Sequence, residues 1–175
     1  MNDLNLPATT FLFHLDERLR ESGFTVWRNI SWPAEAEVLI FGYKNIWFPY
    51  PMSISLFLAE FEHISANSIK IFANDCLKYV QRTVPKTSRA MWFRQYSYIP
   101  VLVSENISTD AVDFVSKIHR PQKNFFLMDY PFPVLINSQN KEIYYYRKHT
   151  YYGWLLNIFH QKLVDRLVVQ NWHQN

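Results

Sequence analysis

A ten-residue segment near the middle of the chain, Ser53–Glu62, is apolar on both faces of the β-strand that it predicts. Successive side chains of a strand point to opposite sides, so even-numbered and odd-numbered positions form separate faces. The even positions from 54 to 58 and the odd positions from 57 to 61 are all apolar. A strand with this pattern lies in the interior of a sheet that is covered on both sides. The segment therefore predicts an α/β protein in which helices cover both faces of a central sheet.

Two amphipathic segments flank this strand and supply helices for the covering layers. In residues 9–22, leucines recur at helical spacing, and Gly23 follows where a left-handed residue ends a helix. A second helix begins at Ser65, its N-cap, and carries an apolar stripe that includes Cys76. Four side chains of the first helix are predicted to face solvent: Asp16, Arg18, Arg20 and Glu21.

The rest of the chain alternates between strand-like and helix-like segments. The other predicted strands are 25–31, 37–42, 98–104, 124–128 and a hairpin of 132–137 with 142–147, and further helices begin at Ser108 and span 153–172. A turn at 42–45 and an aromatic, proline-containing loop or ragged edge at 46–52 separate the second and third strands. Three antiparallel strands are thus followed by strands joined through helical crossovers, which are long enough for right-handed parallel connections. We expect one mixed sheet.

The composition is that of a single folded domain covering residues 1–175. Hydrophobic residues make up 49% of the chain and charged residues 19%, which excludes intrinsic disorder. The three glycines form no glycine-rich phosphate-binding pattern. The one cysteine, Cys76, excludes a disulfide framework and a cysteine-based zinc site, and is expected in the core. The six histidines show no metal-binding spacing, although His63 can join an acidic site beside it or simply face solvent.

Charge and hydropathy limit the partners and the cellular compartment that we expect for the protein. The net charge of +3 is compatible with an anionic partner but does not by itself indicate one. The first residues lack the basic and apolar pattern of a signal peptide, and no apolar run approaches the roughly 20 residues of a membrane span. We therefore expect a soluble, cytoplasmic protein with no membrane partner. Its oligomeric state stays open, and a homodimer is one of the alternatives.

Three glutamates are the candidates for a functional site. Glu37 opens the second predicted strand, and Glu60 and Glu62 stand near the end of the third. If these strands pair antiparallel, the start of one lies beside the end of the other, and Glu60 and Glu62 point to the same face. Converging carboxylates repel each other unless a cation, a raised pKa or exposure to water offsets their charge. An oxygen-rich site of this kind suits Mg²⁺, Mn²⁺ or Ca²⁺, with Glu37 and Glu60 as the candidate ligands. The alternative is that these are strand-end acids that reach water, with or without Lys44 or Lys70 as partners.

The order of elements around these acids resembles the PD-(D/E)XK, or restriction-endonuclease-like, superfamily. The resemblance rests on Glu35–Ile40, a hairpin, and Leu58–Glu62 followed by a helix. With the preceding helix and the following strand, it covers about half of the chain. The family's core has the order αβββαβ, which fits the predicted elements. The resemblance implies a Mg²⁺-dependent nuclease that cleaves phosphodiester bonds, with Glu37 as the first acid and with Glu60 and Glu62 as catalytic residues in the places of the (D/E)xK pair.

The chain departs from the family pattern at the lysine. Glu62 occupies that position, and an acid cannot neutralise charge that develops on a phosphate as a lysine does. Lys44 and Lys70 are the candidates for a lysine that has moved to a neighbouring element, and Glu17 or Glu21 for a further acid from the first helix. A non-catalytic relative that keeps the scaffold as a binding or assembly module, and an unrelated α/β domain, are therefore the alternatives to a nuclease.

Contacts to nucleic acid are expected from a stretch that mixes cations with aromatic rings. Cationic side chains can hold phosphates, and aromatic rings can stack on bases. The candidate nucleic-acid-binding residues are Arg82, Lys86, Arg89 and Arg94, with Trp92 and Phe93 among them. The alternative is an ordinary solvated loop. A second aromatic segment, Trp47–Tyr50, is either a partner-facing patch or a lid over the sheet.

Overall fold

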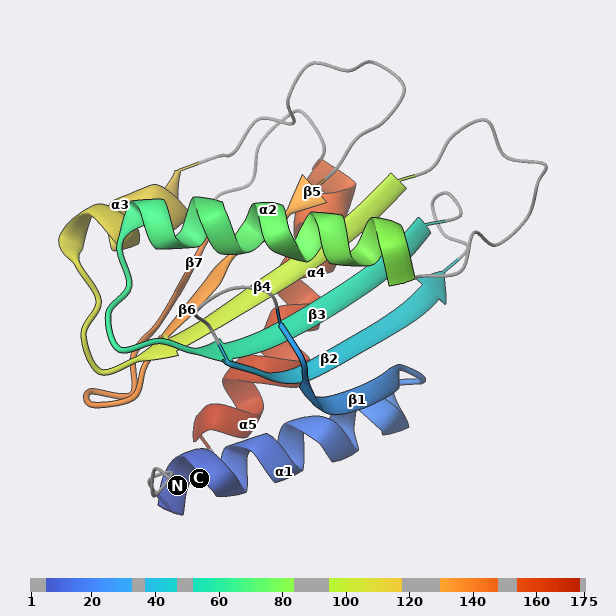
Figure 1. Cartoon of the computed structure of the whole chain (residues 1–175), viewed down its shortest axis with the longest axis horizontal. Helices are drawn as coiled ribbons and strands as arrows, with labels where there is room; N and C mark the ends of the chain where they lie inside the picture. Colours follow the sequence, from blue (N-terminus) through green and yellow to red (C-terminus); the bar gives the residue numbers. More distant parts are fainter. Residues whose placement is uncertain are drawn as a thin grey trace.

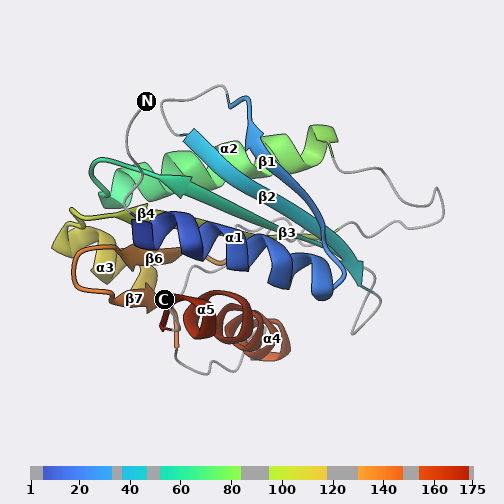
Figure 2. The ribbon, with the colours of Figure 1, turned by 90° about the horizontal axis from the view of Figure 1, so that it is seen from below.

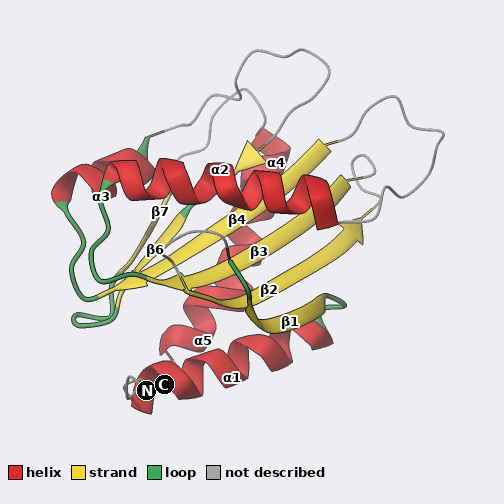
Figure 3. Cartoon of the chain, viewed as in Figure 1, coloured by secondary structure: helices red, strands yellow, loops and turns green. Residues whose placement is uncertain are grey.

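The structure, a computed structural model, describes residues 6–32, 37–46, 52–83, 95–117, 130–147 and 154–173. Its helices are α1 (Leu6–Glu21), α2 (Ala66–Thr83), α3 (Thr109–Ser116), α4 (Trp154–Val164) and α5 (Gln170–His173), with the π-helical segment η1 (Asp165–Val169) between the last two. Its strands are β1 (Thr25–Ile30), β2 (Glu37–Ile46), β3 (Met52–Glu60), β4 (Gln95–Ser104), β5 (Tyr130–Pro131), β6 (Val134–Asn137) and β7 (Ile143–Tyr145). Figures 1 and 3 show how these elements are arranged.

A single mixed sheet forms the centre of the described part of the chain. Its strand order is β1-β2-β3-β4-β6-β7, and β5 pairs with β4 off this path. The first three strands are antiparallel, whereas β3 pairs parallel with β4 and β4 pairs parallel with β6. The predicted mixed sheet is confirmed. Residues 53–59 of β3 are all buried at its centre, as the two-faced apolar pattern requires.

Helices cover both faces of this sheet, as Figure 2 shows from the side of β1. On the α1 face, Leu56 of β3 belongs to one core with Leu15 of α1 and with residues of η1 and α5. On the opposite α2 face, Phe57 of β3 belongs to a second core with Ile69 of α2 and with residues of α3. Cys76 is fully buried in this second core, as predicted. The predicted α/β class with helices on both faces is therefore confirmed.

Local sequence signals set the helix ends. Gly23 has a φ of 79°, and the amides of Gly23 and Phe24 donate to carbonyls of the last turn of α1 at 2.9 and 3.0 Å. This closure leads the chain directly into β1. At the start of α2, the amide of Ser68 donates to Ser65 Oγ at 3.2 Å, and the amide of Ser65 donates to Ser68 Oγ at 3.3 Å. Both helix ends fall where the sequence predicts them.

The predicted turn at 42–45 is wrong, because β2 continues through it to Ile46. Gly42 lies in the middle of the sheet, opposite Val26 of β1 and Leu56 of β3. A Cβ atom at this position would meet side chains of α1 and β1 and of the link between them at 3.5 to 3.7 Å. The glycine therefore lies within a strand that the end of α1 covers, at ordinary van der Waals distance, and not in a turn.

The C-terminal predictions are confirmed in type. The predicted helix 153–172 contains α4 and α5, with the unpredicted π-helical segment η1 between them. The predicted hairpin is formed by β6 and β7, and Asn137 Oδ1 accepts the amides of Gln139 and Asn140 in its turn at 2.9 and 3.1 Å. The predicted strand 124–128 and the aromatic segment 47–50 lie outside the described residues.

Candidate functional site

Glu37 and Glu60 are direct cross-strand partners at one end of the β2–β3 pair. Glu37 is the first residue of β2, and Glu60 is the last residue of β3. Their neighbours along the strands, Val38 and Ala59, belong to the core on the α2 face. Because side chains alternate, both carboxylates point toward the α1 face. The antiparallel pairing expected from the sequence is present, with these two glutamates side by side.

A β-bulge in β2 brings the two glutamates together. The register between β2 and β3 shifts between Val38 and Ile40, so that Leu39 is an extra residue on β2. Strict alternation would place Val38 opposite Glu60. With the bulge, Glu37 takes that place and its side chain changes face. The sequence pattern alone contains no signal for this shift.

A third carboxylate, Glu105, lies near Glu60 and was not among the predicted site residues. It directly follows β4, which runs parallel beside β3. Burial raises the pKa of Glu60 above its ordinary value, and the charges of Glu37 and Glu105 raise it further. We call Glu37, Glu60 and Glu105 the acidic edge. The available signal for Glu105 was its place just after a strand predicted to run beside the third one.

Glu62 follows β3 and is not among the charges that raise the pKa of Glu60. Strand β3 ends at Glu60, after which the amide of Phe61 donates to the carbonyl of Val103 at 2.9 Å and the chain bends. The carbonyl of Glu62 accepts a hydrogen bond from Ser104 Oγ at 3.1 Å, which ties the bend to the end of β4. Phe61 still packs with Ala59 in the core on the α2 face, so the alternation of side chains reaches Phe61. The expectation that Glu60 and Glu62 share one face stays a prediction.

The two candidate lysines are engaged elsewhere. Lys44 is seven residues along β2 from Glu37, which is roughly 20 Å at strand spacing. Its Nζ donates to the carbonyl of Ser22 at 2.6 Å. Lys70 Nζ lies 5.2 Å from the ring centroid of Phe114. In the described part of the chain, no ion pair joins either lysine to a glutamate. No relocated catalytic lysine is found there. Glu37, Glu60 and Glu62 are all exposed, which agrees with the alternative of strand-end acids that reach water.

The other predicted site residues do not join the acidic edge. Helix α1 ends beside Lys44, since a Cβ atom at Gly23 would lie 3.3 Å from Lys44 Nζ. Glu21 and, one turn earlier, Glu17 are therefore displaced toward the opposite end of β2 from Glu37. His63 is exposed on the loop after β3, and Arg82 is exposed at the end of α2. The remaining candidates for nucleic-acid binding lie outside the described residues: Lys86, Arg89, Trp92, Phe93 and Arg94.

The carboxylate ligands available at the acidic edge limit which metal ion the site can bind. Among the residues that the structure describes, no group of three or more His, Cys, Asp or Glu side chains is arranged to hold a metal ion. Glu37 and Glu60 supply two adjacent carboxylates. Mg²⁺ is commonly held by one or two carboxylates together with waters and substrate phosphates. The residues therefore fit a Mg²⁺ whose coordination a phosphate completes, and not a cage made by the protein alone.

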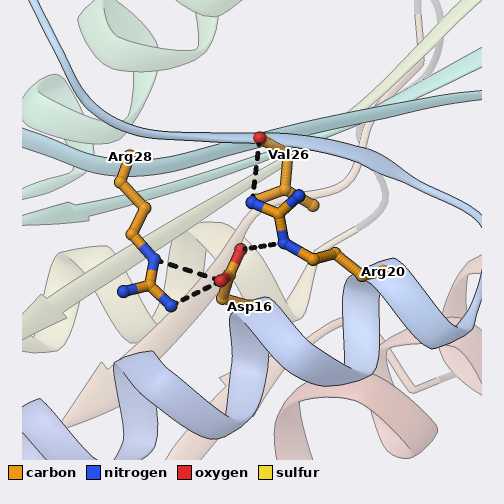
Figure 4. A network of polar contacts seen from close by, with 4 residues as sticks. All are labelled: Asp16, Arg20, Val26 and Arg28. Carbon is orange, nitrogen blue, oxygen red and sulfur yellow. Dashed lines mark hydrogen bonds and ion pairs between the residues drawn. The ribbon is translucent and has the colours of Figure 1, made fainter.

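Asp16 differs from its predicted place on the solvent face of the first helix. It is 6% exposed, and its carboxylate accepts hydrogen bonds from Arg20 Nε and Arg28 Nε, each at 3.1 Å, and from Arg28 Nη2 (Figure 4). Arg20 Nη2 also donates to the carbonyl of Val26 at 3.2 Å. The network joins α1 to β1. Helical spacing could not predict it, because Arg28 comes from a strand.

A second polar pair joins α4 to the sheet. Ser97 Oγ and His160 Nε2 form a hydrogen bond across 63 residues of sequence. The ring of Phe132 stacks on His160 with centroids 5.2 Å apart. Both Ser97 and His160 are 1% exposed. Solvent has almost no access to this serine and histidine, so the pair acts as a satisfied polar contact within the core.

The fold and the acidic edge define a mixed α/β protein with an open, two-sided sheet. Comparison with protein-family models, with curated proteins and with solved structures finds no match for this chain. None of the described helices has the length and apolar character needed to cross a membrane. The resemblance to the PD-(D/E)XK superfamily therefore rests on the order of elements and on the paired glutamates of this chain.

Proposed function

We propose that the acidic edge binds Mg²⁺ and that the chain is a divergent relative of the PD-(D/E)XK nucleases, acting on phosphodiester bonds of a nucleic acid. The observation that carries this proposal is the pairing of Glu37 with Glu60 through the bulge at Leu39. Like charges directly opposite each other destabilise a strand pair, and a bound cation relieves this repulsion. Both glutamates are exposed, so a metal ion can reach them. β-Bulges are frequent next to active sites, where they re-aim a side chain.

The chemistry at this edge follows from its residues. When bound, Mg²⁺ supplies positive charge at a phosphate oxygen and lowers the pKa of a bound water. Glu37 and Glu60 are the proposed ligands, and Glu105 adds a further proton acceptor beside Glu60. In the described residues no lysine contacts these acids. We therefore expect slower cleavage than a site with the lysine would achieve, because less charge on the transition state is neutralised.

A binding or assembly module on the same scaffold is the second candidate function. It is favoured by the donor set, since within the described ranges neither a third metal ligand nor a lysine accompanies Glu37 and Glu60. Such a module would hold its partner without cleaving it. The two candidates differ in whether divalent metal is required.

The test combines thermal unfolding with a cleavage assay. Melting temperatures are measured without metal and with Mg²⁺ or Mn²⁺, each with and without single-stranded DNA, duplex DNA and RNA oligonucleotides. We expect a small shift with metal alone and a larger one with metal and oligonucleotide together, because a ligand that binds only the folded state stabilises it. Glu37→Gln and Glu60→Gln should lose the metal-dependent shift. Glu17→Gln, an exposed glutamate of α1, is the matched control and should keep it.

The outcomes separate the two functions. Cleavage of labelled oligonucleotide that needs metal and disappears in Glu60→Gln supports the nuclease. A shift with oligonucleotide that is unaffected by metal and by both glutamate variants supports the binding module. A melting temperature that no metal changes, with or without oligonucleotide, overturns the proposed metal site.

A further inference from the structure

The open edge of β1 gathers exposed apolar side chains. Among the described residues, the large hydrophobic side chains with high exposure are Phe13 at 59%, Trp27 at 41% and Ile71 at 52%. Two of them flank this edge: Trp27 belongs to β1, and Phe13 of α1 lies 5.7 Å from the guanidinium of Arg28 of β1. Strand β1 is the first in the strand order, and Figure 2 shows it on the near side of the sheet, with α1 on one side and α2 on the other. A strand edge of this kind is a template for another strand.

The backbone groups of β1 that face this edge can be identified from their contacts. The amide of Phe24 donates to an α1 carbonyl at 3.0 Å, and the carbonyl of Val26 accepts from Arg20 at 3.2 Å. Every second residue of an antiparallel strand points its N–H and C=O groups to the same side. The backbone groups of Val26 and Arg28 therefore face away from β2. They are the groups that a further strand would meet, and the Val26 carbonyl would accept this strand's amide as a second donor beside Arg20 Nη2.

A row of aromatic rings reaches this edge on the α2 face. Trp27, Phe41 and Phe57 are in register across β1, β2 and β3. The ring centroids of Trp27 and Phe41 are 5.3 Å apart with an interplanar angle of 17°, and those of Phe41 and Phe57 are 4.7 Å apart with an angle of 29°. Tyr43 also stacks with Trp27, at 5.5 Å and 9°. The row ends at Trp27, where no further described strand follows.

We propose that β1 pairs with β1 of a second copy of this chain, antiparallel and centred on Trp27. In this register Val26 pairs with the partner's Arg28, and Arg28 pairs with the partner's Val26, so the outward backbone groups of both copies meet. Trp27 then faces the partner's Trp27 in the closer type of antiparallel pair. The partner's ring becomes the next member of the aromatic row. The arrangement is isologous, as in most homodimers.

The charges and the shape of β1 limit the strength of the contact. Asp16 is shared by Arg20 and Arg28, so each copy keeps one net positive charge beside this edge and the two copies repel there. Asn29 has a φ of 48°, which bends the strand just after Arg28. The pairing segment is therefore short, and the contact belongs to the small, weak class of interfaces. The dimer forms at high protein concentration, and it does not depend on the acidic edge.

Sedimentation equilibrium of the full chain tests this proposal. Protein concentrations from roughly 10 µM to roughly 1 mM cover the dissociation constants of weak interfaces. We expect the wild type to pass from monomer to dimer in this range and Trp27→Lys to stay monomeric. Ile71→Lys, which changes an exposed apolar residue of α2 away from the edge, is the matched control and should dimerise like the wild type. In the wild type, hydrogen exchange at the amides of Val26 and Arg28 should become slower as the protein concentration rises. This measurement tests the interface without any variant.

Several results would overturn the proposal. One is a wild type that stays monomeric at every concentration, and another is Trp27→Lys that dimerises like the wild type. A dimer that leaves the exchange of Val26 and Arg28 unchanged places the interface elsewhere. A monomeric wild type whose affinity for a single-stranded oligonucleotide falls in Trp27→Lys but not in Ile71→Lys assigns the exposed ring to base stacking instead.

Discussion

Asp16 of α1 and Glu60 of β3 are both carboxylates, and their neighbours give them opposite roles. Asp16 is held by two guanidinium groups, so its negative charge joins α1 to β1. Glu60 faces Glu37 and lies near Glu105, so its negative charge is opposed. An acid paired with cations stabilises the fold, whereas acids gathered together repel each other unless a proton, a metal ion or water offsets their charge. The neighbours, and not the residue type, make Glu60 the candidate for function.

The raised pKa of Glu60 predicts a pH-dependent stability. The folded chain holds this proton more tightly than the unfolded chain, so the stabilisation is fully present below the ordinary carboxyl pKa and is lost as pH rises through the raised value. Glu60→Gln should therefore gain stability over the metal-free wild type as pH rises from about 4 to about 7, reaching up to about 1 kcal/mol. Urea denaturation across this pH range measures the difference.

The control for this experiment is Glu17→Gln, which alters an exposed glutamate and should follow the wild type at every pH. A Glu60→Gln variant that is less stable than the wild type at pH 7 would show that the charge of Glu60 is compensated in the folded chain. The acidic edge would then have no need of a metal ion.

At the scale of elements, two glycines near the α1–β1 junction have different tasks. Gly23 has a positive φ and ends α1. Gly42 lies within β2, where the structure shows no positive φ and where the end of α1 packs on the strand. Glycine correctly predicts a chain reversal at Gly23, whereas at Gly42 it wrongly predicts a turn. The difference depends on what packs over the glycine, which is a property of the folded chain.

Alanine at each glycine should separate these tasks. Gly23→Ala forces a side chain into the left-handed region and should cost about 1 kcal/mol of unfolding free energy. At Gly42 a Cβ atom meets its neighbours only at 3.5 to 3.7 Å, which is ordinary contact. Gly42→Ala should therefore change stability by less than about 0.5 kcal/mol. Chemical denaturation measures both variants, and a larger loss at Gly42 would contradict the packing described for β2.

At the scale of the whole molecule, two apolar cores lie on opposite sides of the same strands. Leu15 packs in the core on the α1 face, and Ile69 packs in the core on the α2 face. Both cores include residues of β3 and β4. Since neither layer can lose its packing without exposing these shared strands, we expect the two layers to unfold together.

Truncation of one core residue in each layer tests this coupling. Leu15→Ala and Ile69→Ala each remove a fully buried side chain and should each cost about 2 to 5 kcal/mol. Both should lower the midpoint of one shared transition, seen alike by far-UV circular dichroism and by tryptophan fluorescence. Two separate transitions in either variant would mean that the layers are independent units.

Much of the fold was predictable, because periodicity reports which side of an element is buried. The helices at Ser65 and Ser108, the central position of 53–59 and the C-terminal hairpin follow from the spacing of apolar residues and from caps and turns. The candidate site was predictable only in part. Glu37 and Glu60 were selected correctly as neighbours, but Lys44 bonds to Ser22 instead, and Glu105 was missed.

The amino-acid sequence by itself determined the type and order of most described elements, since spacing and end signals are local properties. The tertiary structure alone decided which charges meet. Strand register depends on pairing between distant segments, and one extra residue at Leu39 moves Glu37 to the other face and opposite Glu60. The end of β3 at Glu60 and the position of Glu105 likewise depend on contacts with β4. Glu62 and Ser104, which form one of these contacts, are 42 residues apart in the sequence. Interactions over that range leave no periodic trace in the sequence.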